Sequence, residues 1–309
     1  MKMNSRVIIT GANGFIGSNI ISEMIVNDFP ITALVRNRAK TDYLKKIKCY
    51  NIIHSDNYSD PTLLRKLNMS KPEYIIHCAL DKNELTDTKN LISALEMAKQ
   101  INCKGFITIG SYKEYGYLKK NLTEDIVCNP LDKFSRLKHS QNMLASQICD
   151  SLGINHLHLR LGIPYSHKYN TNFYFTNIIG RLSKDEFIDT KNIYEVKDFI
   201  HTSDIARGIL SLMENNLSGS YNLSFGDGIE MKSVLKMIYE KLNKKFIFDE
   251  SKNSSFSEFS LNINKIYKAT NWKPSISIWD GISLLIQLAK FNSKPSLDDF
   301  TSRIRSLYK

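Results

Sequence analysis

The stretch from residue 6 to residue 17 reads RVIITGANGFIG, and it decides the fold. Its apolar, β-branched start predicts a strand, and the glycines that follow have the spacing Gly-x-x-Gly-x-x-Gly. At a strand–turn–helix junction, Gly11 permits the tight turn, Gly14 lets the backbone approach a pyrophosphate, and Gly17 lets the helix pack closely against the strand. The first N–H groups of the helix then face the phosphates. The turn therefore predicts a dinucleotide site formed by Gly11, Asn13, Gly14, Phe15, Ile16 and Gly17.

Short apolar runs alternate with helical patterns through the first half of the chain. Such alternation is typical of right-handed βαβ units and a parallel sheet, and near-continuous apolar strands indicate a sheet covered on both faces. We therefore predict an α/β fold with a Rossmann-type doubly wound parallel sheet. Strands are expected at 6–10, 31–35, 49–54, 73–78, 105–109 and 155–160, and helices at 15–27, 87–100 and 132–152.

The pattern changes beyond residue 161. Residues 165–172 are polar and loop-like, and the last part of the chain mixes a helix at 231–242, a short strand at 245–248 and two more helical segments. We predict a dinucleotide-binding domain over residues 1–165, to which residues 198–224 return. A smaller α/β substrate domain is expected over residues 166–309.

Composition narrows the class of partner. The chain has 309 residues, and Lys plus Arg exceed Asp plus Glu by 42 to 31, which gives a net charge of +11. Such an excess favours polyanionic partners, although a solvated basic surface would look the same. A basic stripe interleaved with aromatic residues is missing, and no apolar run approaches the roughly 18 residues of a membrane span. We therefore expect no nucleic-acid partner and no membrane partner.

The cysteine pattern indicates the compartment. The five cysteines are scattered, and none forms a Cys-x-x-Cys pair, which indicates reduced thiols rather than a disulfide framework or a zinc site. The N-terminus lacks the long apolar segment of a signal peptide. We therefore expect a cytoplasmic protein. His, Asp and Glu show no metal-ligand spacing along the chain, so we predict no metal.

The end of the second expected strand distinguishes the two nicotinamide cofactors. An acidic residue there would bind the ribose 2′-hydroxyl of NAD, but the sequence continues as Arg36-Asn37-Arg38. The forked guanidinium of an arginine can bind a 2′-phosphate, and this favours NADP(H). The alternative is that both arginines are simply solvated. Asp56 follows the third strand, where it could accept a hydrogen bond from the adenine amino group or lie in a loop.

Besides the glycine turn, the chain carries a series of ordered motifs, which are IIHCA (75–79), GSYKEYG (110–116), RLGIPY (160–165), EVKDFIHTSD (195–204), YNL (221–223) and NWKP (271–274). Together these motifs resemble the extended short-chain dehydrogenase/reductase family, and within it the nucleotide-sugar epimerases, dehydratases and 4-ketoreductases. In the motif at 195–204, Lys197 stands where the family usually has Arg. The resemblance covers nearly the whole chain and implies cofactor contacts from Cys78 and Ala79. It also implies a homodimer formed through the helices at 87–100 and 132–152.

The resemblance also implies three catalytic groups. A Ser or Thr hydroxyl holds the substrate oxygen, a Tyr exchanges a proton with it, and a Lys four residues later lowers the pKa of the Tyr and binds the nicotinamide ribose. Ser111 matches the first role and Lys138 the third, but Phe134 stands in the position of the Tyr. A phenyl ring can neither donate nor accept a proton, and loss of a general acid typically costs about 10²–10⁴ in rate.

Three explanations for Phe134 stay open. The chain could be a Tyr-to-Phe variant made to trap a bound substrate, or a catalytically silent relative that only binds nucleotide. It could also be an enzyme that uses another acid, for which the candidates are Tyr112, Lys113, Tyr115 and His139.

Substrate contacts are implied only by the resemblance. Asn172 and Phe175 lie where the family contacts the nucleotide-sugar, with ordinary helix packing as the alternative. Lys252 is a weak substitute for an arginine that relatives supply to the diphosphate. Glu114 stands where a small apolar residue is frequent, and it is either exposed or in contact with the sugar. Glu124 is either a base or a solvated loop carboxylate. The expected substrate-binding residues are Ser111, Tyr112, Tyr115, Asn172, Phe175 and Lys252.

These features favour one reaction. A preference for NADP(H), the lack of a second acid/base pair and a compact C-terminal region favour NADPH-dependent reduction of an NDP-4-keto-6-deoxy sugar to an NDP-deoxyhexose. Such sugars are used for surface polysaccharide such as lipopolysaccharide O-antigen. The alternatives are an NDP-sugar epimerase or dehydratase of the same family, and a non-catalytic NADP-binding regulatory protein.

Overall fold

The chain forms two units, and the computed structural model describes residues 6–49, 51–117, 119–166, 174–186, 188, 192–246 and 257–290. The first unit contains Met1–Gly116, Val127–Arg160 and Ala206–Tyr221. The second contains Tyr117–Ile126, Leu161–Ile205 and Asn222–Lys309. The domain limits expected from the sequence stay a prediction.

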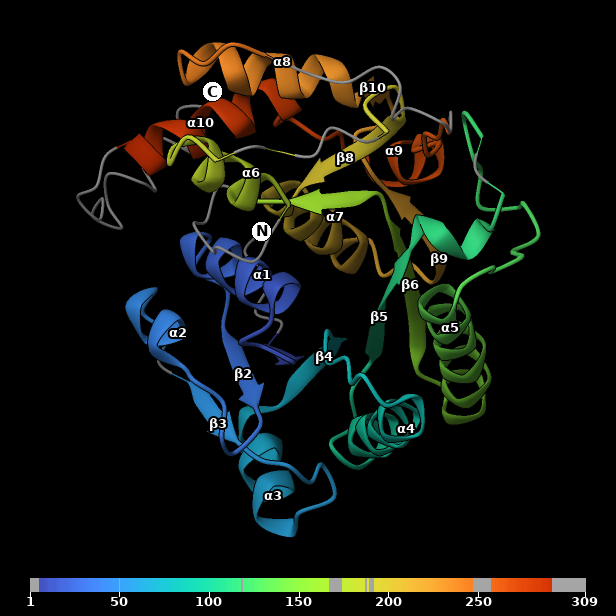
Figure 1. Cartoon of the computed structure of the whole chain (residues 1–309). Helices are drawn as coiled ribbons and strands as arrows, with labels where there is room; N and C mark the ends of the chain where they lie inside the picture. Colours follow the sequence, from blue (N-terminus) through green and yellow to red (C-terminus); the bar gives the residue numbers. More distant parts are fainter. Residues whose placement is uncertain are drawn as a thin grey trace. The chain divides into compact units, whose positions relative to one another are not determined.

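A seven-stranded sheet has the strand order β3-β2-β1-β4-β5-β6-β9 (Figure 1). The pairs β1–β2, β1–β4, β2–β3 and β4–β5 are parallel. The order reverses beside β1, which makes the carboxyl ends of β1 and β4 the switch point where ligands bind in doubly wound sheets. The predicted Rossmann-type fold is therefore confirmed. The strands are β1 (Arg6–Thr10), β2 (Ile31–Val35), β3 (Ile52–His54), β4 (Pro72–His77), β5 (Gly105–Ser111), β6 (Asn155–Leu161) and β9 (Gly219–Leu223).

Helices cover this sheet. Every residue of β5 is buried, as expected for a strand covered on both faces. Helices α4 and α5 lie side by side (Figure 1), and their apolar residues share one core with α3 and β5 that includes Leu67, Leu91, Phe106 and Cys149. The helices that begin in this part are α1 (Phe15–Val26), α2 (Asp42–Lys46), α3 (Pro61–Ser70), α4 (Glu84–Gln100), the 3₁₀ helix η1 (Tyr112–Tyr115) and α5 (Lys133–Leu152).

The second unit has a core of its own. Its three-stranded sheet has the order β10-β8-β7, in which β7 and β8 are parallel and β10 is antiparallel to β8. Helices α6, α8 and α10 pack together (Figure 1) around a core that includes Tyr165, Phe199 and Ile282. The elements of this unit are β7 (Ile163–Tyr165), α6 (Tyr174–Leu182), β8 (Val196–His201), β10 (Gly228–Glu230), α8 (Met231–Lys241), α9 (Asn264–Thr270) and α10 (Ile278–Lys290). Helix α7 (Thr202–Glu214) begins in the second unit, and its residues from Ala206 onward belong to the first.

Several boundaries differ from the sequence-based expectations. Helix α4 begins at Glu84 rather than at residue 87, because the Asn83 side chain accepts the Thr86 N–H and caps the helix one turn earlier. The strand expected at 245–248 is wrong for Lys245 and Phe246, which have no strand conformation, and residues 247 and 248 lie outside the described residues. Within the part of the chain that the structure describes, no helix is long and apolar enough to cross a membrane.

Asp132 starts the helix that carries Phe134 and Lys138, and its loss is expected to destabilise the protein. Its carboxylate accepts the Ser135 N–H at 2.7 Å, and this hydrogen bond is the main reason that its pKa falls to about 2. An unfolded Asp titrates near the ordinary value, so the contribution of this charge is present above about pH 4 and is lost as the pH falls towards 2.

We expect Asp132→Ala to lower the free energy of unfolding by about 1 kcal/mol, because alanine leaves the first-turn N–H groups uncapped. Asp132→Asn is the matched control, since asparagine caps equally well and loses only the exposed ion pair with Lys113. Urea unfolding at neutral pH measures the free energy of unfolding of both variants. An alanine variant as stable as the parent chain would contradict this account of the cap.

Candidate active site

The glycine turn joins β1 to α1 and lines a hollow of about 470 Å³ at the switch point of the sheet. Gly11 has φ +61°, and a Cβ there would lie 2.6 Å from the backbone of Ala79. A Cβ on Gly17 would lie 2.6 Å from the Gly11 carbonyl oxygen. Gly14 is the N-cap of α1 and offers no side chain to its N–H groups. The turn thus presents bare backbone, which suits a phosphate group.

Most of the predicted cofactor residues meet around this hollow. Gly17 and Lys138 do not line it, and the sequence reasoning missed Tyr58 and Asp81, which do. Asp81 lies on the loop after β4, and its carboxylate is 3.6 Å from the Arg36 guanidinium. Asp56 accepts the N–H of Asn37 at 3.1 Å and so holds the loop after β2. The predicted residues that line the hollow are Gly11, Asn13, Gly14, Phe15, Ile16, Arg36, Asp56, Cys78 and Ala79.

Ser111 ends β5 and caps η1. Its Oγ accepts the Lys113 N–H at 3.3 Å, and its own N–H donates to Glu114 Oε1 at 2.7 Å. Ser111 and Glu114 together form a capping box, which fixes the backbone on both sides of the hydroxyl. The hydroxyl is therefore held at the carboxyl end of a central strand.

Phe134 and Lys138 lie one turn apart on α5. The Phe134 side chain is 40% exposed, whereas Lys138 is 7% exposed. The Lys138 Nζ lies 6.0 Å from the centre of the Phe134 ring and donates to Gln141 Oε1 at 3.2 Å. Gln141 in turn donates to the buried carboxylate of Asp87. Burial lowers the pKa of Lys138, and the negative charge of Asp87 opposes that shift.

Lys138 also affects the pKa values of two side chains at the end of β4. Burial raises the pKa of the Cys78 thiol to about 12, although the charge of Lys138 acts against the rise. Burial lowers the pKa of His77 to about 3, and Lys138 adds to this shift. Both residues are therefore neutral at physiological pH, and Lys138 is the local cation.

Glu114 is fully buried, so the expectation that it is exposed is wrong. Its carboxylate oxygens lie 3.0 Å from His158 Nε2, and Oε2 lies 3.7 Å from Arg160 Nε. A Cβ on Gly110 would lie 2.3 Å from His158 Nε2, so glycine makes room for the pair. Burial raises the pKa of Glu114, but His158, the Ser111 N–H and Arg160 together bring it below its ordinary value.

One signal for this cluster was present in the sequence. Strand β6 reads NHLHLRL, so His156, His158 and Arg160 alternate with leucines and share one face. Because β6 is an interior strand of the sheet, the polar side chains on that face need hydrogen-bond partners inside the protein. Thr108 supplies one of them, since its hydroxyl lies 2.8 Å from His158 Nδ1.

The predicted substrate residues are only partly brought together. Tyr115 is buried and accepts a hydrogen bond from Arg160 Nη1 at 3.2 Å, whereas Tyr112 begins η1. Phe175 packs in the core of the second unit, 5.3 Å from the Phe199 ring, which favours the helix-packing alternative. Asn172 and Lys252 lie outside the described residues.

The Glu124 side chain forms a hydrogen bond within the second unit. Its carboxylate accepts the Asn222 N–H at 2.9 Å, and Asn222 itself is fully buried. The expectation of a simply solvated loop carboxylate is therefore wrong.

Known proteins resemble the chain along nearly its whole length. The dTDP-4-dehydro-6-deoxyglucose reductase of Escherichia coli is 23% identical over 305 residues, which cover 91% of this chain and 96% of the relative. A putative UDP-glucose 4-epimerase of Methanocaldococcus jannaschii is 21% identical and covers 93% of this chain and 99% of its own length. The crystal structure of a dTDP-glucose 4,6-dehydratase from Bacillus anthracis superposes with a TM-score of 0.81 at 16% identity, over 94% of this chain and 98% of that one.

A match to a family model over more than half of the chain shows the family itself. Residues 7–224 match the model of the NAD dependent epimerase/dehydratase family, a span that runs from the glycine turn to the end of β9. The resemblance to the extended short-chain dehydrogenases/reductases is thereby confirmed. The chain belongs to the NAD dependent epimerase/dehydratase family.

Proposed function

We propose that the chain reduces an NDP-4-keto-6-deoxy sugar to an NDP-deoxyhexose with NADPH, as a step towards a surface polysaccharide. The observation that carries the proposal is the hollow at the switch point, which combines a bare glycine turn with Arg36 and lacks a carboxylate directly after β2. The Escherichia coli relative, whose name states reduction of a dTDP-linked 4-keto sugar, supports the same reaction.

The side chains have separate roles in this reaction. NADPH, when bound, supplies the hydride that reduces the carbonyl carbon. The Ser111 hydroxyl donates a hydrogen bond to the carbonyl oxygen, and the capping box keeps that hydroxyl in place. Lys138 would hold the nicotinamide ribose, and its buried positive charge would stabilise negative charge on the substrate oxygen. The oxygen still needs a proton, and Phe134 cannot provide one.

Arg36 is proposed to select NADP(H). We expect Arg36→Gln to weaken NADPH binding about 10- to 100-fold, because a charge-assisted hydrogen bond contributes about 1.5–3 kcal/mol. NADH binding should stay unchanged, since NADH has no 2′-phosphate. Isothermal titration with both cofactors measures the two affinities.

Arg38→Gln is the matched control, because Arg38 is exposed and does not line the hollow. Equal losses for NADPH and NADH, or a loss of the same size in the Arg38 variant, would show that Arg36 does not recognise the phosphate. Tighter binding of NADH than of NADPH by the parent chain would overturn the cofactor assignment.

Turnover distinguishes the proposed reaction from its alternatives. The purified chain is incubated with NADPH and with dTDP-, GDP-, CDP- and UDP-linked 4-keto-6-deoxyhexoses. The proposal predicts oxidation of NADPH that depends on one of these sugars. The Methanocaldococcus jannaschii relative favours epimerisation, which would convert an NDP-sugar without net NADPH consumption. A chain stabilised by cofactor but by no NDP-sugar would support the regulatory alternative.

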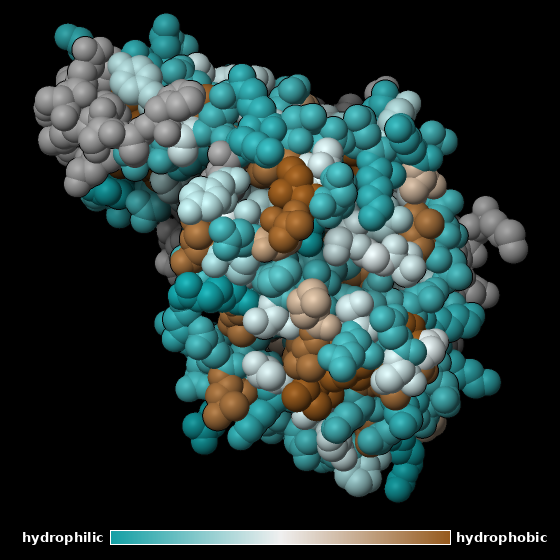
Figure 2. All heavy atoms as spheres, turned by 90° about the vertical axis from the view of Figure 1, so that its right-hand side faces the viewer, coloured by the Kyte–Doolittle hydropathy of each residue, from teal (hydrophilic) through white to brown (hydrophobic). Residues whose placement is uncertain are grey.

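A homodimer is also proposed. Large apolar side chains are exposed on both α4 and α5, with Leu85 at 65% and Met143 at 60%. Figure 2 looks onto the side that carries α5 and shows hydrophobic side chains among the hydrophilic ones. Light scattering of the purified chain tests the proposal, and a monomer at micromolar concentration would contradict it.

A further inference from the structure

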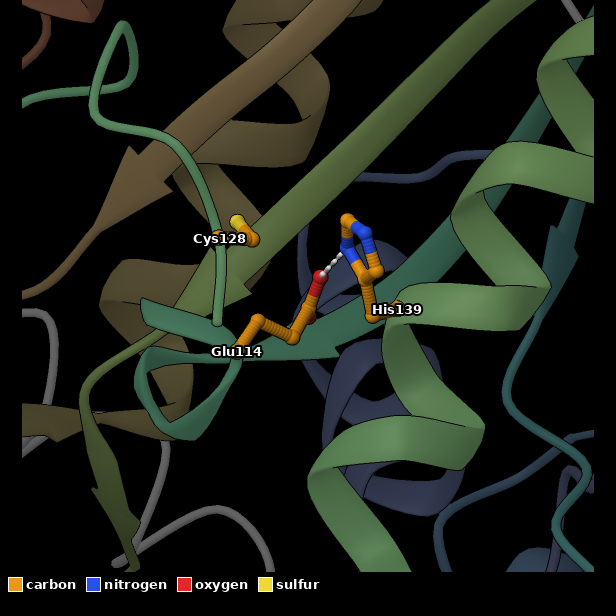
Figure 3. Close-up of side chains that lie close together, drawn as sticks. All are labelled: Glu114, Cys128 and His139. Atoms are coloured by element: carbon orange, nitrogen blue, oxygen red, sulfur yellow. Dashed lines mark ion pairs between the residues drawn. The ribbon is translucent and has the colours of Figure 1, made fainter. Parts of the chain in front are cut away.

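Three side chains with metal-binding atoms converge next to Ser111. Glu114 comes from η1, Cys128 from the loop before α5, and His139 from α5 itself, and the three side chains lie close together (Figure 3). Their ligand atoms all lie within 4.8 Å of one another, and His139 Nδ1 is 3.9 Å from Glu114 Oε2. One nitrogen, one sulfur and one oxygen donor form a set that suits zinc, which takes three protein ligands where a fourth position stays open.

Hydrogen bonds already orient the Glu114 carboxylate in a way that suits a metal ligand. Glu114 Oε1 accepts the Ser111 N–H, and His158 Nε2 lies 3.0 Å from both oxygens. The hydroxyl of Thr108 lies at 2.8 Å from His158 Nδ1, so His158 is held between two partners. Outer hydrogen bonds of this kind orient a ligating carboxylate and strengthen metal binding.

His139 has a buried nitrogen without a hydrogen bond, and it lies beside a hollow. Its Nδ1 is buried and forms no hydrogen bond among the described residues, which is costly unless a further partner is present. The same residue lines an open hollow of about 860 Å³ between α5 and the start of β9. His139 is therefore the member of the cluster that lies next to this hollow.

One nearby charge limits the affinity. The Arg160 guanidinium lies 3.7 Å from Glu114 Oε2 and repels a dication, whereas the carboxylate and a Cys128 thiolate attract it. The thiol must also lose its proton, and burial raises its pKa. We therefore expect weaker binding than at a site with the same ligands and no neighbouring positive charge.

We propose that Glu114, Cys128 and His139 form a binding site for a zinc-like divalent cation, which replaces the sequence-based expectation that no metal binds. Binding of an ion at this site does not require the proposed reaction. Because Glu114 also accepts the Ser111 N–H, an ion there is linked through Glu114 to the residue expected to hold the substrate oxygen. If the proposed reaction holds, zinc is expected to change its turnover.

Cobalt and zinc titrations test the site on the full chain. The metal-free protein is titrated with Co²⁺, for which a thiolate ligand gives a charge-transfer absorption band, and with Zn²⁺ by calorimetry. Cys128→Ser and His139→Gln remove one ligand each, and neither side chain is fully buried. His54→Gln is the control, because His54 is exposed and distant in sequence from the cluster. Circular dichroism verifies the fold of every variant.

The expected result is one ion per chain, a charge-transfer band that Cys128→Ser abolishes, and at least tenfold weaker Zn²⁺ binding in both ligand variants. His54→Gln should bind as the parent chain does. The proposal is wrong if no saturable binding occurs, if bound Co²⁺ gives no charge-transfer band, or if both ligand variants bind Zn²⁺ unchanged.

Discussion

Phe134→Tyr is expected to raise the turnover of the 4-keto sugar by about 10²–10⁴, the contribution of one positioned proton donor. The ring lies in the first turn of α5, and Lys138 Nζ is 6.0 Å from its centre. A nearby ammonium lowers the pKa of a phenol, which prepares the new hydroxyl for proton transfer. Because the side chain is 40% exposed, an added hydroxyl needs no space in the core, and the stability should change by less than about 0.5 kcal/mol.

Phe134→Leu is the control for this variant, since it also lacks a proton donor and should keep the low turnover of the parent chain. Initial rates of NADPH oxidation at saturating cofactor compare the three proteins. If tyrosine brings no gain, the missing hydroxyl does not limit the reaction. Tyr112, Lys113, Tyr115 or His139 would then be the acid to examine.

Lys138→Met, made in the Phe134→Tyr chain, is expected to remove most of that gain, with a loss of about 10²–10³ in turnover. Methionine fills a similar volume but cannot hold the ribose or lower the pKa of Tyr. Lys138 is nearly buried, and burial disfavours its charge, so its removal should leave the melting temperature within a few degrees. The variant should therefore lose turnover and keep its thermal stability.

Lys133→Met provides the comparison, because Lys133 lies on the same helix with a side chain that is 71% exposed. It should keep both the turnover and the melting temperature. Retained turnover in Lys138→Met would remove Lys138 from the mechanism. A large fall in melting temperature would instead indicate that Lys138 serves the fold through Gln141 and Asp87.

The first part of the fold could be predicted because its signals are local. Strand β1, the glycine turn and helix α1 are contiguous, and close contacts with the Gly11 carbonyl oxygen within the turn require glycine at position 17. Helix α2 and strand β7 are too short for a hydrophobic period to reveal them. The start of α4 was misplaced because a cap, rather than apolar spacing, determines it.

The buried cluster at Glu114 could not be predicted in the same way. Glu114 and His158 are 44 residues apart, and their contact depends on β5 and β6 being neighbours in the sheet. The alternation in β6 signals a polar face but does not name its partner. Likewise, the spacing of Glu114, Cys128 and His139 along the chain does not match a local metal motif, and only the fold brings them together.

Transfer of a deuterium label tests the central claim most directly. The parent chain and the Phe134→Tyr variant are each incubated with NADPH deuterated at the transferable position and with the 4-keto sugar that supports turnover. The products are then analysed by mass spectrometry and NMR. Ketoreduction predicts deuterium at C4 of the NDP-deoxyhexose and one NADP⁺ for each product. An unlabelled, epimerised sugar with unconsumed cofactor, or no sugar product from either protein, would contradict the account.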